Sequence, residues 1–139
     1  MIVNHDQSEV AVKIRAESDA NGLAKALVDA AESAPDAFEV ERDATGLELR
    51  ACAPLQNGSP NRARLKIVSP RPGHTLVFFY KKSLVPHSRD RYSYGGIDLR
   101  TPNVDKSDIS EWLAFASSGF HPDHRPAKLR RAFPFEIPG

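Results

Sequence analysis

Four short segments in the middle of the chain have the spacing of strands, and turn-forming residues join them in pairs. Phe38–Arg42 and Leu47–Ala51 alternate in polarity around Asp43-Ala44-Thr45-Gly46. Arg64–Val68 and Thr75–Lys81 flank a link rich in Pro and Gly. A period of two is typical of strands, and short Gly-containing links between them predict hairpins. Two successive hairpins restrict the centre of the chain to an antiparallel sheet.

Other segments extend this pattern on both sides. Residues 9–16 alternate cleanly, which predicts a further strand, and 97–100 resemble a short edge strand. An alanine-rich stretch predicts a helix over about residues 20–33, ended by Pro35. The sequence therefore predicts an α+β fold: a single domain with a mostly antiparallel sheet of about five strands and two helices packed on it.

The second helix has the clearest signal. Over about residues 107–118, apolar residues recur at intervals of three and four, which gives one apolar stripe: Ile109, Trp112, Leu113 and Ala116. Gly119 suits the left-handed position after the last turn, and Phe120 is placed to fold back on Phe115. This combination predicts a Schellman motif at the end of the helix.

Length and composition indicate one domain over residues 1–139. Residues 81–96 have no period and contain Pro86, Gly95 and Gly96, so we expect a long loop there. The proline-rich residues 121–139 are expected to pack along the body as an extended tail, because Phe133, Phe135 and Ile137 alternate within it.

The same evidence bears on the compartment. No apolar run approaches the length of about 20 residues that a membrane-spanning helix needs, and the N-terminus has no apolar signal region. We therefore expect no contact with a membrane. The single cysteine, Cys52, cannot form an internal disulfide, which favours a reducing, cytoplasmic setting. Its place within the alternating run Leu47–Ala53 predicts a half-buried thiol on a strand.

Charge is divided along the chain. Residues 1–50 hold eleven acidic and five basic side chains, a formal net charge of −6, whereas residues 62–91 hold eight basic side chains and one acidic, a net charge of +7. We call residues 62–91 the basic segment. Such asymmetry favours a surface for an anionic partner, although acidic residues of the first third would neutralise part of that surface if they packed on it. The residues predicted to contact a partner are Arg64, Lys66, Lys81, Lys82, Arg89, Arg91, Tyr92 and Tyr94.

We expect the chain to be a non-enzymatic protein-binding module that recognises a protein with an acidic surface, in the manner of small bacterial inhibitors and immunity proteins. Opposed charges suit electrostatic steering, and Arg and Tyr are frequent at interface hot spots. A first alternative is a binder of single-stranded nucleic acid, because cations interleaved with aromatic rings suit phosphates and bases.

A second alternative is a small enzyme that uses histidines as acid–base groups. It would require three of the following histidines to converge on one pocket: His74, His87, His121 and His124. His121 and His124 also have a spacing that suits a shared metal, but Pro122 interrupts the turn and no third ligand is evident. We therefore predict no catalytic residues, no metal and no cofactor.

Overall fold

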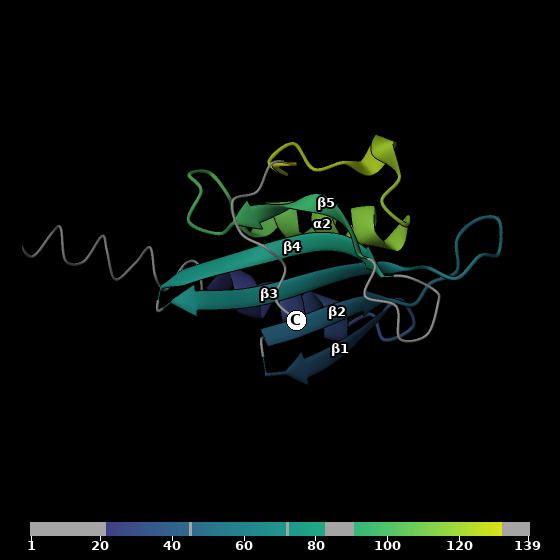
Figure 1. Cartoon of the computed structure of the whole chain (residues 1–139), viewed down its shortest axis with the longest axis horizontal. Helices are drawn as coiled ribbons and strands as arrows, with labels where there is room; N and C mark the ends of the chain where they lie inside the picture. The colour runs from purple at the N-terminus through teal and green to yellow at the C-terminus, as the bar shows by residue number, and fades with distance from the viewer. Residues whose placement is uncertain (1–21, 45, 72, 83–90, 132–139) are drawn as a thin grey trace, which may run out of the picture.

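The computed structural model describes residues 22–44, 46–71, 73–82 and 91–131. They form one five-stranded antiparallel sheet in which each strand pairs with its neighbours in sequence, in the order β1-β2-β3-β4-β5. The strands are β1 (Phe38–Asp43), β2 (Gly46–Ala51), β3 (Ala63–Arg71), β4 (His74–Lys82) and β5 (Arg91–Asp98). A helix over residues 22–32 and helix α2 (Ile109–Ser117) both lie behind the sheet in Figure 1. The predicted α+β fold, with one antiparallel sheet and two helices, is confirmed.

The core lies between the helices and one face of the sheet. Leu27 of the first helix and Trp112 of α2 are almost fully buried, together with Leu65 and Phe79 of the two central strands. Burial of such large apolar side chains contributes roughly 1.5–3 kcal/mol each. Successive side chains of a strand point to opposite faces of the sheet. The face away from the two helices, here called the second face, is therefore formed by every other residue of each strand.

Both predicted hairpins are present. In the first, Gly46 has φ 151°, and a Cβ built there would lie only 2.1 Å from the carbonyl oxygen of Ile67. Any other residue would therefore collide with β3, which pairs with β2 at this point. Glycine is required by this close approach as well as by the turn.

Helix α2 ends as predicted. It follows a one-turn 3-10 helix, η1 (Lys106–Asp108), and its last turn closes with Phe120 N–H donating to Phe115 O at 2.8 Å and Gly119 N–H donating to Ala116 O at 3.0 Å. These are the two bonds of a Schellman motif. The rings of Phe115 and Phe120 lie 4.8 Å apart, so the predicted contact is confirmed.

The prediction of a loop over 81–96 is wrong at both of its ends. β4 continues to Lys82, and β5 begins at Arg91, well before the short edge strand predicted at 97–100. Gly96 exchanges two backbone hydrogen bonds with Arg130, of 3.0 and 3.1 Å. A Cβ at Gly95 would lie 2.3 Å from the oxygen of Arg130. Gly95 and Gly96 therefore allow the backbone at Arg130 to approach β5 closely, and a pattern of side chains in the sequence does not predict such a contact.

Some predictions fall outside the described residues. These are the strand at 9–16, the first residues of the first helix, the middle of the predicted loop at 83–90, and Phe133, Phe135 and Ile137 of the predicted tail. The described part of that tail includes a 3-10 turn, η2 (Pro122–His124), and buried Leu129. Within the described residues, neither helix has the length and apolar character needed to cross a membrane.

Candidate functional site: a basic pocket at one end of the sheet

The second face of the sheet carries charged side chains that are deeply buried. Tyr80 donates a hydrogen bond to Glu48, and both side chains are buried. Lys66 forms an ion pair with Asp43, and the side chain of Lys66 is only 5% exposed. Buried charges are costly unless they are paired, and these two contacts provide partners for groups on β2, β3 and β4.

Arg64, two residues before Lys66 on β3, differs from these neighbours. Its residue is 8% exposed, and its NH1 group donates to the carbonyl oxygens of Ala63 at 2.9 Å and Asn61 at 3.4 Å. Its Nε is buried without a hydrogen-bond partner, and no carboxylate among the described residues forms an ion pair with it. Burial lowers the pKa of Arg64, and repulsion from Arg50 lowers it further. The negative charge of Glu48 opposes these two effects only in part, so the charge of this guanidinium is incompletely compensated.

Arg64 lines a pocket of about 480 Å³, here called the basic pocket, at the end of the sheet where β2 leaves and β3 begins. Its charged lining consists of four cations and one carboxylate: Arg50, Arg62, Arg64, Lys82 and Glu39. Strand register brings these side chains together, because Arg50 pairs with both Glu39 and Arg64 across the sheet, and Lys82 N–H donates to Arg62 O. Arg50 is already engaged, at 2.9 Å from Glu41 and 3.8 Å from Glu39. Arg62, Arg64 and Lys82 have no such carboxylate among the described residues.

Asn61 fixes the position of the pocket relative to the helix layer. Its side-chain nitrogen donates to Ala116 O at 3.1 Å and Ser117 O at 3.0 Å, at the end of α2. Its side-chain oxygen accepts from Ala63 N–H at 2.9 Å. The residue is buried, so these bonds anchor the loop over residues 52–62 that projects beyond the sheet in Figure 1.

Cys52 also lines the basic pocket, but its thiol is not activated. It follows the end of β2 and is exposed, so the prediction of a half-buried strand thiol is wrong. Partial burial raises the pKa of the Cys52 thiol, the negative charge of Glu39 raises it further, and the nearby arginines only partly oppose this. A raised pKa disfavours the nucleophilic thiolate, so the arrangement does not indicate cysteine catalysis.

The predicted partner-contact residues whose side chains are described do not form one surface. Arg64 and Lys66 share a strand face as expected, but both are buried, and Asp43 of the acidic first third neutralises Lys66. The expectation that the cations of the basic segment stand together on the exterior is therefore wrong for these two. Lys82 is exposed and lines the basic pocket.

Four of the remaining predicted contacts belong to β4 or β5: Lys81, Arg91, Tyr92 and Tyr94. Lys81 projects to the opposite face from Lys82, and its Nζ lies 5.4 Å above the ring of Tyr94. Tyr94 in turn packs on Phe120, with ring centroids 4.7 Å apart. Tyr92, opposite Lys81 in the register, is 57% exposed. Arg89 lies outside the described residues, and Arg91 is placed in β5 as the register partner of Lys82.

The sequence pattern did not single out Arg50, Asn61 or Arg62 as site residues. Arg50 belongs to the acidic segment over residues 1–50, and only strand register brings it beside Arg64. Alternation predicts which residues share a face of one strand, but it does not fix which residue of the next strand lies opposite.

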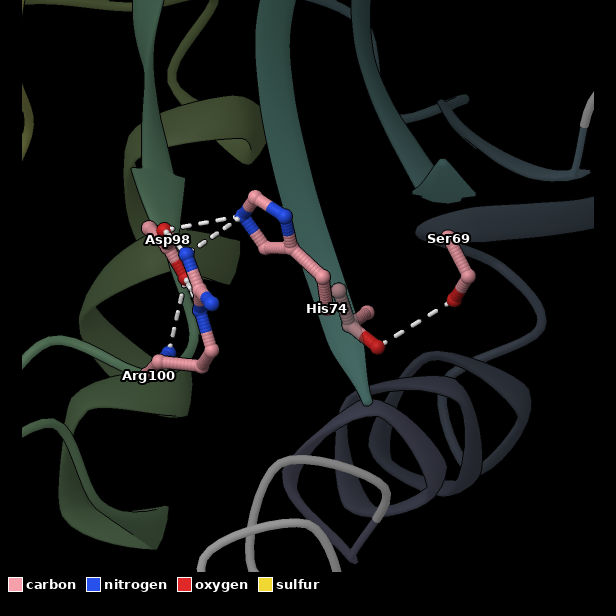
Figure 2. A network of polar contacts seen from close by, with 5 residues as sticks. Ser69, His74, Asp98 and Arg100 are labelled. Atoms are coloured by element: carbon pink, nitrogen blue, oxygen red, sulfur yellow. Dashed lines mark hydrogen bonds and ion pairs between the residues drawn. The ribbon is translucent and has the colours of Figure 1, made fainter. Parts of the chain in front are cut away.

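A second polar cluster lies at the far end of β4, where His74 is buried (Figure 2). His74 Nε2 lies 3.0 Å from Asp98 Oδ2 and 3.0 Å from a terminal nitrogen of Arg100, which also contacts Asp98 at 3.2 Å. Burial raises the pKa of Asp98, but hydrogen bonds from Arg100 and the contact with His74 outweigh it and leave that pKa below its usual value. The neighbouring contact in Figure 2 joins Ser69 and Thr75 at 3.2 Å.

The histidines of the enzyme alternative are dispersed. His121 and His124 line another cavity of about 780 Å³, between α2 and the loop containing Leu55, with their rings 6.2 Å apart. His74 belongs to the separate cluster with Asp98, and His87 lies outside the described residues. Over residues 22–44, 46–71, 73–82 and 91–131, no group of three or more His, Cys, Asp or Glu side chains is arranged to hold a metal.

The chain was compared with known proteins at three levels. No protein-family model, no curated protein and no solved structure matches it.

Proposed function

We propose that this protein is a non-enzymatic binding module that docks an acidic protein partner at the basic end of its sheet. The observation that carries the proposal is the surplus of positive charge in the basic pocket, where Arg62, Arg64 and Lys82 lack carboxylate partners among the described residues. Complementary charge accelerates association and excludes partners of the wrong sign. The exposed ring of Tyr92 lies on the other face of the β4–β5 pair, with Lys81, and is not part of this surface.

The positions of the tyrosines favour a protein partner over single-stranded nucleic acid. Binding of a single strand uses several aromatic rings on which successive bases stack. Tyr80 is buried, and Tyr94 is engaged by Lys81 and Phe120. Tyr92 alone among the three tyrosines, all of which are described, offers an exposed ring. One stacking surface does not make a binding track.

The general class we propose is that of small bacterial inhibitors and immunity proteins, in which a compact domain blocks a charged partner. A single cysteine suits a reducing compartment, so we place the interaction in the cytoplasm.

The test is affinity capture from native lysate with the full chain and two charge-reversal variants, with the eluate divided for protein and nucleic acid. Lys82→Glu reverses a charge in the basic pocket, whereas Lys25→Glu reverses one on the first helix, where the side chain is 80% exposed. We expect a protein of acidic surface to elute with salt from the parent chain and from Lys25→Glu, and to be lost from Lys82→Glu. Equal capture by the two variants would refute the proposal.

A binding titration separates the nucleic-acid alternative. A labelled single-stranded oligonucleotide is titrated at about 50 mM salt, where non-specific electrostatic binding is strong enough to detect. We expect no binding. Binding that is lost with Lys82→Glu and with Tyr92→Ser would transfer the function to single-stranded nucleic acid.

A further inference from the structure

Among the described residues, the basic pocket is lined by four cations and one carboxylate, which is a surplus of positive charge. Arg64 is 8% exposed, its Nε is buried without a partner, and none of the described carboxylates forms an ion pair with it, although the negative charge of Glu48 offsets part of its own. A buried charge that is only partly compensated is unfavourable, so the pocket favours an additional anion. Arg50 lies close enough to repel Arg64, and a bound anion would relieve that repulsion as well.

We propose that the basic pocket binds a phosphate group, held by Arg64 at its base and by Arg62 and Lys82 at its rim. Three cations that form no ion pair with a described carboxylate match a dianion better than they match a single carboxylate. Arginine offers a planar fork of donors that suits phosphate oxygens, and lysine contributes a mobile point charge. The site rests on the proposed docking function and deepens it, because the phosphate group occupies the same three cations that the acidic partner would contact.

The guanidinium of Arg64 is already oriented. Two carbonyl oxygens, from Asn61 and Ala63, accept hydrogen bonds from its NH1 group, and Asn61 is itself fixed to the end of α2. A donor that is held in place loses little entropy on binding. The rim differs, because Lys82 is exposed and free to close on a ligand. A volume of about 480 Å³ also leaves room for part of the molecule that carries the phosphate.

The chain provides its own reporter for this test. Cys52 is the single cysteine, it is exposed, and it lines the basic pocket. A phosphate bound beside it should hinder a reagent sterically and disfavour the thiolate electrostatically. Iodoacetamide is the suitable reagent because it is neutral and does not compete for the site. The reaction is followed at about pH 8, where phosphate is mostly dianionic.

We expect inorganic phosphate at about 10 mM to slow the modification of Cys52 about tenfold, which corresponds to a dissociation constant of about 1 mM. Potassium chloride at matched ionic strength and potassium acetate should have little effect. Phosphoserine distinguishes the sources of the group: a stronger effect than that of inorganic phosphate indicates a phosphorylated side chain, and a weaker one indicates the free ion. Either result supports the site.

Variants test the assignment of residues. Lys82→Gln should reduce the effect of phosphate severalfold, whereas Lys81→Gln, with the same change of charge on the opposite strand face, should leave it unchanged. Arg64→Met should abolish the effect while the protein remains folded, because an apolar chain of similar length replaces a poorly compensated buried charge. If Arg64→Met does not fold, the comparison of Lys82→Gln with Lys81→Gln still tests whether the basic pocket binds phosphate.

Three results would overturn the proposal. The first is an unchanged rate of Cys52 modification in phosphate. The second is an equal slowing by acetate or chloride, which would indicate simple screening or a site without preference for phosphate. The third is an equal loss of the phosphate effect in Lys81→Gln and Lys82→Gln.

Discussion

Asn61 is the residue whose replacement tests most directly how the basic pocket is held. In Asn61→Ala, three hydrogen bonds of 2.9–3.1 Å are lost together. The Ala63 N–H is left without a partner in a buried position, which costs about 1–3 kcal/mol. Ala116 O keeps the bond from Gly119 N–H at 3.0 Å, and Ser117 O is only partly buried. We therefore expect a loss of about 2–4 kcal/mol in the free energy of unfolding.

The matched control is Asn57→Ala in the same loop. Asn57 also uses its side-chain oxygen to accept a backbone hydrogen bond, from Ser59 N–H at 2.9 Å, but that bond is exposed to solvent. Water replaces the lost acceptor there, so the expected cost is only about 0.5–1 kcal/mol. The two costs are measured by urea unfolding at neutral pH, with the m-value compared to ensure that both variants unfold as the parent does.

The reasoning is refuted by equal losses in the two variants. That result would mean that the loop over residues 52–62 is held by contacts other than those of Asn61. A loss in Asn61→Ala alone, accompanied by a weaker effect of phosphate on Cys52, would connect the end of α2 to the geometry of the basic pocket.

Two further predictions concern the other charged contacts. In Asp43→Asn, we expect the free energy of unfolding to fall by about 1–3 kcal/mol, because the buried Lys66 ammonium loses its carboxylate; the half-exposed Asp43 site limits this cost. Urea unfolding should show that adding Lys66→Met restores part of the lost stability. A double variant no more stable than the single one would contradict this. The folded-state pKa of Asp98 lies below its usual value of 3.8. The contribution of the ionised Asp98 to stability is therefore complete above about pH 4 and is lost as the pH falls through the folded-state pKa. The stability difference between the parent and Arg100→Gln should therefore be largest near neutral pH and shrink below about pH 4, and a difference that does not change with pH would rule out the carboxylate as its cause.

Elements with strong local signals were predictable from the sequence. The hairpin at Gly46 and the Schellman motif at Gly119 each combine a side-chain period with a glycine at the required position, and both are confirmed. Strand β5 was missed because its sequence, RYSYGGID, has no period of alternating polarity. Its place depends on backbone pairing with β4 and on the close approach of Arg130, and neither leaves a periodic trace.

The candidate site was only partly predictable for a related reason. Lys82 and Arg64 belong to the basic segment and were identified by charge, whereas Arg50 is remote in sequence and reaches the pocket through strand register. Charge counting also cannot separate a buried, paired lysine such as Lys66 from an exposed one such as Lys82. The local sequence pattern predicts which residues of one strand share a face. Which charged residues of neighbouring strands lie side by side depends on the strand pairing in the folded sheet.

The backbone bridge between Gly96 and Arg130 has a consequence for the behaviour of the protein in solution. An outer strand with a long row of unpaired amides is a template on which another chain can add a strand. Here the donor and acceptor of Gly96, the sixth of the eight residues of β5, are already taken by the chain itself. An incoming strand therefore finds two short stretches instead of one continuous edge, which protects this side of the sheet from edge-to-edge aggregation.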